Sequence, residues 1–116
     1  MGIKYVSNEN SEFIELRSWA RRKCVQGENC TIAINDLGER KATIHSHPHE
    51  QITYFLQGET DFQVGDRIIH ARPGDIIVIP PNVPHSGGSS ACTMIDFFTP
   101  RREDFVECPY TDEQAE

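Results

Sequence analysis

Hydrophobic and polar residues alternate along most of the chain, in short stretches separated by glycine, proline and polar turns. Thr31–Asn35 (TIAIN) is rich in β-branched residues and predicts a short strand. Ile52–Leu56 is a second apolar stretch, and Ile76–Ile79 is an unbroken apolar run of the kind found in buried strands. Ala91–Thr99 (ACTMIDFFT) predicts the last long strand, which Pro100 ends.

Turn-forming residues indicate where several of these strands end. Thr60–Val64 and Arg67–His70 flank Gly65-Asp66, and a two-residue loop that begins with glycine predicts a type II′ hairpin. Pro73-Gly74 has the residue types of the centre of a type II turn. We also expect a strand over Lys41–His47.

The two ends of the chain are less regular. Residues 1–12 are polar and predict a loose arm, and residues 101–106 allow a single helical turn. Residues 12–25 could contain a helical turn, but we favour two short strands there. About eight to ten short strands without a long helix predict an all-β fold. For so short a chain, a small jelly-roll barrel is the most economical arrangement.

Length and charge narrow the class of protein. The 116 residues fit one domain, residues 1–116, in which 107–116 form an acidic tail. The formal net charge of −7 argues against a nucleic-acid-binding surface. No stretch reaches the roughly twenty apolar residues of a membrane-spanning helix, and the N-terminus lacks the apolar core of a signal peptide. We therefore expect a cytoplasmic protein with no membrane partner.

The cysteines show neither a CxxC pair nor zinc-finger spacing. They are Cys24, Cys30, Cys92 and Cys108. In a cytoplasmic protein we expect reduced thiols, several of them packing in the interior. A disulfide between Cys24 and Cys30 is the alternative.

Histidines are concentrated in residues 45–51 (HSHPHEQ), and another histidine ends the stretch PPNVPH. On a strand, residues two apart share a face, so His45 and His47 would both point into a barrel. Pro48 should bend the strand. The prolines before His85 stiffen the backbone, which lowers the entropic cost of holding a metal ligand there. The sequence thus predicts one metal site, with the ligands His45, His47, Gln51 and His85 and with His49 in reserve.

This ligand set is uncharged, so a bound divalent ion would keep its full charge. Such an ion can polarise a hydroxyl or carbonyl oxygen, or lower the pKa of bound water. Nitrogen-rich ligation suits zinc, nickel, iron, manganese or copper, and the sequence does not choose among them. Gln51 could instead bond only to the backbone.

The histidine-rich stretches resemble the two motifs of the cupin superfamily of small metal-binding β-barrels. The first motif, broadly G-x5-H-x-H-x3-E/Q-x6-G, is matched by His45, His47, Gln51 and Gly58, with its leading glycine, Gly38, displaced by one residue. The second is matched in part, because Pro73-Gly74-Asp75 is followed by PPNVPH and the histidine comes after the prolines. The resemblance implies a cupin double-stranded β-helix with one bound metal.

A narrower likeness is to the single-domain cupins of pectin and alginate breakdown. HSHPHEQ, PPNVPH and the ending D-x-F-x-P-x-R-E-D-F over residues 96–105 carry it. It implies conversion of 4,5-unsaturated uronates, the ends left by polysaccharide lyases, into linear ketonised sugars. Asp96 would be the general acid/base, Arg102 would pair with the uronate carboxylate, and Phe98 would stack on the sugar. Arg101 could be the inward arginine instead, and Asp96 could be a structural strand carboxylate.

Two other functions remain open at this point. One is a small metal-dependent dioxygenase, which would take up oxygen when loaded with iron. The other is a non-catalytic cupin that binds a sugar acid without turnover. Many cupins are dimers, so we expect a homodimer. We expect His49 and His70 to lie at the surface or to support the ligands, Cys92 to be a packing thiol, and Arg17, Arg21 and Arg22 to line the mouth of the site or the surface.

Overall fold

The computed structural model describes residues 3–105 and Cys108. These residues form nine strands and no helix, as the alternating pattern predicts. The strands are β1 (Ile14–Arg17), β2 (Ala20–Gln26), β3 (Thr31–Leu37), β4 (Glu50–Gly58), β5 (Thr60–Val64), β6 (Arg67–Ala71), β7 (Ile76–Ile79), β8 (His85–Ser86) and β9 (Cys92–Thr99). No helix in this part of the chain is long and apolar enough to cross a bilayer.

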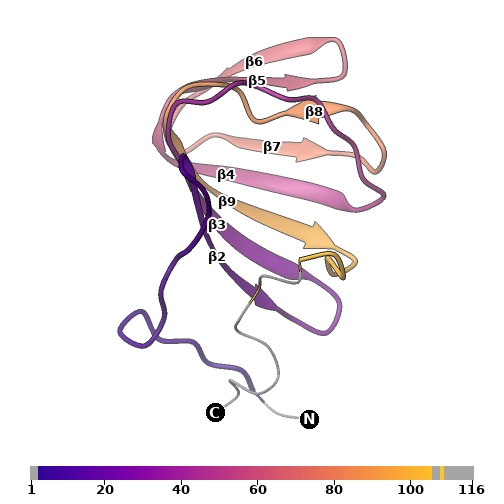
Figure 1. Cartoon of the computed structure of the whole chain (residues 1–116). Coiled ribbons are helices and arrows are strands. Elements are labelled where there is room, and N and C mark those ends of the chain that lie inside the picture. Colours follow the sequence, from indigo (N-terminus) through magenta and orange to yellow (C-terminus); the bar gives the residue numbers. More distant parts are fainter. Residues whose placement is uncertain (1–2, 106–107, 109–116) are drawn as a thin grey trace.

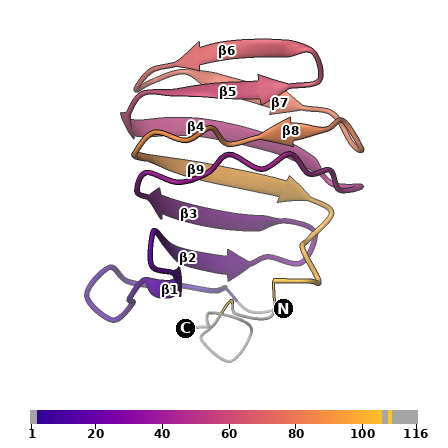
Figure 2. The same cartoon turned by 45° about the horizontal axis from the view of Figure 1, so that its top comes forward.

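The strands form two antiparallel sheets that curve towards each other. The larger sheet has the order β1-β2-β3-β9-β4-β7, and the smaller has the order β6-β5-β8. Figure 1 shows the resulting open jelly roll. The connection from β3 to β4 runs alongside β8, where His45 and His85 form an isolated bridge (Figure 2). This bridge joins two segments that are distant in the sequence and that both carry predicted ligands.

The main error of the sequence-based prediction is the strand over Lys41–His47. The structure has only the His45 bridge there, and the chain bends at residues 48–49, where Pro48 removes a backbone donor. The two-residue strand β8 was not predicted. The two strands between residues 12 and 25 are confirmed. Residues 101–105 form no helix; the Phe105 amide donates to the Arg102 carbonyl over 3.1 Å in a turn, and residue 106 lies outside the described residues.

Both predicted glycine turns are confirmed by backbone angles. Gly65 has a φ of 57°, whereas Asp66 is not among the residues with positive φ, as a type II′ turn requires. Gly74 has a φ of 94°, which suits the third position of a type II turn.

The hydrophobic core lies where β4, β5, β7 and β9 face one another. Phe55 and Phe62 are fully buried, with their ring centroids 5.7 Å apart in an edge-to-face contact. The other buried members of this cluster are Ala71, Ile77, Ile79, Cys92 and Met94. Phe62 and Met94 of this cluster also line the cavity described below, so the core borders the site.

The cysteine prediction is wrong for one pair, because the structure joins Cys24 to Cys108 in a disulfide. Their Cα atoms are 5.3 Å apart although 84 residues separate them in the chain, so spacing alone could not reveal the pair. Cys30 is free and exposed, so the alternative Cys24–Cys30 bond is also wrong. Cys92 is a buried thiol, as expected of a packing residue. The predicted tail, residues 107–116, lies outside the described residues except for Cys108.

Candidate metal centre

Three imidazoles converge on one point. The ligand atoms of His45, His47 and His85 all lie within 4.8 Å of one another. The backbone explains the approach, because His45 and His85 exchange two N–H···O bonds of 2.9 and 2.8 Å across their bridge. His45 is exposed, whereas His47 and His85 are buried. The structure therefore brings together the three predicted histidine ligands, although without the strand that was expected to carry the first two.

Each histidine uses one ring nitrogen to hold its orientation. Nδ1 of His47 donates to the His49 carbonyl over 3.0 Å, and Nδ1 of His85 donates to the Val83 carbonyl over 2.9 Å. His45 bonds to the Thr43 carbonyl. In neutral imidazoles this leaves Nε2 of His47 and His85 with a free lone pair. Backbone acceptors behind metal-binding histidines are the usual way of fixing the ligating nitrogen.

Two observations show that the site fits a cation. Nε2 of His85 is buried and has no hydrogen-bond partner among the described residues. Nε2 of His47 faces Oε1 of Gln51 at 3.0 Å. The Gln51 amide nitrogen donates elsewhere, to Thr53 Oγ1 and Asp96 Oδ1, so Oε1 is the atom that points at His47. Two acceptor atoms that face each other beside an orphaned ring nitrogen would be satisfied by a bound cation, so His47, Gln51 and His85 fit the role of ligands.

Electrostatics also favour ligation. Burial is the main cause that lowers the pKa of His45, His47 and His85 below 6.5. The imidazoles are therefore neutral near neutral pH, the form that binds metals. No carboxylate belongs to the ligand group that the described residues form. The structure thus presents the uncharged, nitrogen-rich donor set that the sequence predicts.

A cavity of about 520 Å³ opens beside these histidines. Its wall includes His45, Gln51 and His85, and Asp96 is the one carboxylate among its lining residues. Five cationic side chains also line it: Arg17, Arg22, Arg40, Lys41 and Arg102. With five cationic side chains and one carboxylate in its lining, the cavity suits an anionic ligand, and a metal held by the histidines would add to this positive charge.

Asp96 lies at the bottom of this cavity and is 5% exposed. Its Oδ1 accepts from Thr53 Oγ1 over 2.5 Å and from Gln51 Nε2 over 3.1 Å, and its Oδ2 accepts from Asn35 Nδ2 over 2.6 Å. Burial raises the pKa of Asp96, while the bonds from Thr53 and Asn35 oppose that rise. Asn35 and Thr53 were not singled out in the sequence, although strand alternation places Thr53 on the same face as Gln51.

Arg102, rather than Arg101, lines the cavity. Its guanidinium carbon lies 4.7 Å from the centroid of Phe98 and 4.2 Å from that of Phe105. Nε and Nη2 donate to the two oxygens of Asp104 over 2.9 and 2.7 Å, and this bonding holds the pKa of Asp104 at about 2. Arg101 instead bonds to the Gly27 carbonyl and pairs with Glu103. Phe98 serves both as cavity wall and as a member of a small core cluster.

The other predicted candidates, three arginines and His49, lie partly inside and partly outside the cavity. Arg17 and Arg22 line the cavity, whereas Arg21 pairs with Asp36 at 2.5 Å outside it. The ring of His49 is not part of the three-histidine group; its carbonyl orients His47.

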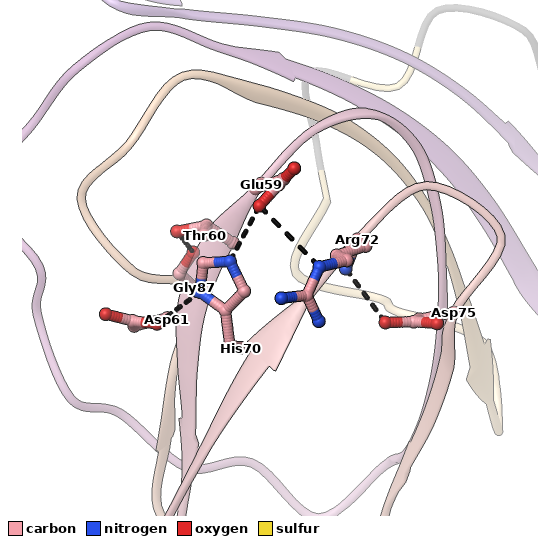
Figure 3. Close-up of polar contacts among 7 residues, drawn as sticks. All are labelled: Glu59, Thr60, Asp61, His70, Arg72, Asp75 and Gly87. Atoms are coloured by element: carbon pink, nitrogen blue, oxygen red, sulfur yellow. Dashed lines mark hydrogen bonds and ion pairs between the residues drawn. The ribbon is translucent and has the colours of Figure 1, made fainter.

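His70 lies on β6, away from this site, between two carboxylates (Figure 3). Nδ1 faces Asp61 Oδ1 at 2.8 Å and Nε2 faces Glu59 Oε1 at 2.7 Å, and these bonds raise the pKa of His70 above 6.5. The stabilisation from this pairing should be complete below pH 6.5 and should disappear as the pH rises through the raised pKa. An NMR titration should find this pKa above 6.5, with Asp61→Asn moving it down; a value at or below 6.5 would contradict the prediction.

Comparisons with known proteins identify the fold. The family profile of the cupin domain (Cupin_2) matches residues 35–98. No curated protein matches the sequence. Among solved structures, an RmlC-like cupin from Shewanella frigidimarina NCIMB 400 is 26% identical, with 88% of this chain and 95% of that chain covered and a TM-score of 0.81.

Two further structures share the fold. KdgF from Halomonas sp. is 23% identical, with 90% of this chain and 99% of that chain covered and a TM-score of 0.79. Bacillus subtilis oxalate decarboxylase, a protein with Mn(II) centres, is 17% identical, with 86% of this chain and 30% of that chain covered and a TM-score of 0.73. The profile spans more than half of the chain, so the protein belongs to the cupin domain family.

Proposed function

We propose that this protein is a metal-dependent enzyme that opens the ring of 4,5-unsaturated uronates and ketonises the product. The observation that carries the proposal is that the histidine group, Asp96 and Arg102 meet at one cavity. The spacing of Asp96, Phe98 and Arg102, which resembles that of the pectin and alginate cupins, and the structural likeness to KdgF support the same substrate class.

The ligands would be His45, His47, Gln51 and His85. When bound, a divalent ion supplies Lewis-acid polarisation of sugar oxygens. The protein's part is to keep three imidazoles neutral and aimed by their backbone bonds, so that little reorganisation is needed on binding. The neutral donor set leaves the charge of the ion available to the substrate.

Asp96 is the proposed proton carrier. In the reaction the proton leaves the anomeric hydroxyl, the bond from C1 to the ring oxygen breaks, and C1 becomes an aldehyde. The ring oxygen then carries the electron pair as an enolate, and a proton added at C4 gives the ketone at C5. The product is an isomer of the substrate, so one carboxylate can accept and return the proton. Oδ2 of Asp96, which accepts one bond from Asn35, is the oxygen with room for this role.

Arg102 is the proposed partner of the uronate carboxylate. Asp104 uses the guanidinium edge formed by Nε and Nη2, which leaves the Nη1–Nη2 edge for a second carboxylate. The guanidinium lies against both Phe98 and Phe105, which contact each other edge to face, and these cation–π contacts help to hold it in place. The other cationic lining residues would attract the anionic sugar to the cavity.

Loss of the ultraviolet absorption of the 4,5-double bond tests the proposal. Protein loaded in turn with zinc, nickel, iron, manganese or copper should bleach an unsaturated uronate with at least one of them, and a chelator should stop the reaction. Asp96→Asn should slow bleaching by about a hundredfold or more, while Asp61→Asn, a carboxylate outside the cavity, should leave it unchanged. Binding without bleaching would favour a sugar-acid-binding protein, and oxygen uptake with iron would favour a dioxygenase; either result overturns the proposal.

We also propose that the protein is a homodimer that packs through the outer face of the larger sheet. Ile52 on β4 lies between Val78 on β7 and Phe97 on β9 in the strand register. With Tyr54 and Ile76 these side chains are 36–62% exposed. The patch measures on the order of 500 Å², large for a monomer, and it would supply most of the roughly 800 Å² that each partner buries in a typical interface.

Light scattering after gel filtration should therefore give twice the mass of one chain. Ile76→Lys should give the mass of one chain, because a charge would be buried within the interface. Ile68→Lys, at an equally exposed isoleucine on the other sheet, should leave the dimer intact. A wild-type mass of one chain would refute the proposed dimer.

The proposed location is the cytoplasm, as the composition predicts. The Cys24–Cys108 disulfide is unusual for that compartment, where thiols are kept reduced.

A further inference from the structure

The orientation of the Gln51 amide decides whether the fourth ligand exists. We propose that Asp96 selects which atom of Gln51 faces the histidines, so that Asp96 is a positioning residue for the metal-ligand set. This inference rests on the metal site of the proposed function but not on the proposed reaction or substrate.

An amide can rotate by half a turn with almost no change of shape, exchanging its oxygen for its nitrogen. In the observed orientation, Oε1 lies 3.0 Å from Nε2 of His47. In the rotated orientation the amide nitrogen would stand there and donate to the same imidazole lone pair. That bond would satisfy His47, and it would remove two metal ligands at once. The metal-free protein therefore keeps both ligands only if other contacts favour the orientation in which the Gln51 oxygen faces His47.

Asp96 and Thr53 provide these contacts. The Thr53 hydroxyl gives its hydrogen to Asp96 Oδ1 over 2.5 Å, so it can only accept from Gln51 Nε2, 2.9 Å away. Asp96 Oδ1, which already receives the Thr53 hydrogen, also accepts from Gln51 Nε2, at 3.1 Å. The amide nitrogen thus faces two acceptors, and an amide oxygen in its place would face the same two without a hydrogen between them.

The carboxylate is itself held in place from three strands. Asp96 on β9 lies directly opposite Thr53 on β4 and Ala33 on β3 in the register. Asn35 on β3 donates to Asp96 Oδ2 over 2.6 Å, and its own oxygen accepts from Arg22 Nε over 2.7 Å. This chain of bonds fixes the direction in which Asp96 presents its acceptors, and therefore the direction of the Gln51 amide.

The same logic explains why residue 51 is a glutamine rather than a glutamate. A glutamate at this position would place an acceptor against Asp96 Oδ1 with no hydrogen to share. Exchanging the two groups, as Gln51→Glu together with Asp96→Asn, restores the match. The new amide at position 96 can then donate to the new carboxylate at position 51, while its oxygen accepts from Asn35. Replacing both residues should therefore preserve the hydrogen bond between positions 51 and 96, whereas replacing either one alone should disrupt it.

A double-mutant cycle on metal affinity tests this. Affinities for Co²⁺ are measured without substrate, by competition with a chromophoric chelator, for the wild type, Asp96→Asn, Gln51→Glu and the double variant. When Gln51 is present, Asp96→Asn should weaken binding by about 10–100-fold, as loss of partners behind a ligand does. When the chain already carries Gln51→Glu, the same substitution should weaken binding by less than about threefold, or strengthen it.

Any other pattern overturns the inference. A loss of equal size in both backgrounds would mean that Asp96 acts only through its charge, and no loss in either would mean that it does not act on the metal. Absence of metal binding by the wild type would overturn it as well. Absence of turnover by a wild type that does bind metal would overturn only the proposed reaction.

Thr53→Val provides a second test that does not depend on correct folding of the Asp96→Asn variant. It removes one of the two acceptors for the amide nitrogen and keeps the shape of the side chain, so it should weaken Co²⁺ binding in the same direction by a smaller factor. The visible spectrum of bound Co²⁺ should change in Asp96→Asn and return towards that of the wild type in the double variant. Unchanged binding and an unchanged spectrum in Thr53→Val would contradict the inference.

Discussion

Replacing His85 with alanine is expected to weaken metal binding by at least about a hundredfold, since even partners behind a metal ligand contribute 10–100-fold. His85 is 2% exposed, and its Nε2 is aimed at the other histidines with no bond of its own. Thermal unfolding with and without metal measures the loss. At a metal concentration of 100 Kd, binding should stabilise the wild type by about 2.7 kcal/mol and the variant by about 0.4 kcal/mol or less.

His70→Ala is the matched control, because it removes a histidine that lies outside the site. Its metal-dependent stabilisation should equal that of the wild type. His85→Ala will also lower the stability of the metal-free protein, because the ring stacks on the buried Phe62. The comparison is therefore made between metal-bound and metal-free forms of each variant. Equal metal-dependent stabilisation of His85→Ala and the wild type would refute the assignment of His85 as a ligand.

Gly58→Ala is expected to lower the free energy of unfolding by about 2–5 kcal/mol. Gly58 ends β4 with a φ of 79°, a conformation that costs an alanine about 1–2 kcal/mol. A Cβ there would also lie 2.9 Å from the Cα of Cys92, its partner across the sheet, and would overlap the Ala91 carbonyl. Such an overlap with backbone atoms typically adds about 1–3 kcal/mol. Urea denaturation monitored by circular dichroism measures the change.

Gly74→Ala separates the two causes. Gly74 has a φ of 94°, but a Cβ there would meet no atom within 4 Å. This variant should therefore lose only the conformational part, about 1–2 kcal/mol. If the two variants are destabilised equally, the close approach of β4 and β9 at Gly58 is not what requires a glycine. The positive backbone angle would then be the full reason why position 58 requires a glycine.

Local patterns were sufficient for most of the fold. Alternation and β-branched residues located β3, β4 and β9 to within a few residues, because each of these strands has one face in the interior. The unbroken apolar run located β7, but the expected burial of the whole strand was wrong, since Ile76 and Val78 are 62% and 53% exposed. Gly65 and Gly74 marked turns because their backbone angles are unfavourable for other residues. The strand predicted over Lys41–His47 is absent because strand propensity is a property of one segment alone. A β-ladder also needs a neighbouring segment along its whole length. Among the described residues, that segment forms a β-bridge at His45 alone, and the His47 carbonyl accepts one further backbone bond from the Asn82 amide.

The sequence by itself determined an all-β barrel and the four residues that could bind a metal, because ligand chemistry and strand periodicity are local properties of a chain. Only the tertiary structure decided that Arg102 rather than Arg101 lines the cavity, that Cys24 meets Cys108, and that the Gln51 amide donates to Thr53 and to Asp96, which in turn accepts from Asn35. Each of these depends on which strands lie side by side, and hydrogen-bond donors and acceptors on separate strands find their partners only when the sheets have formed.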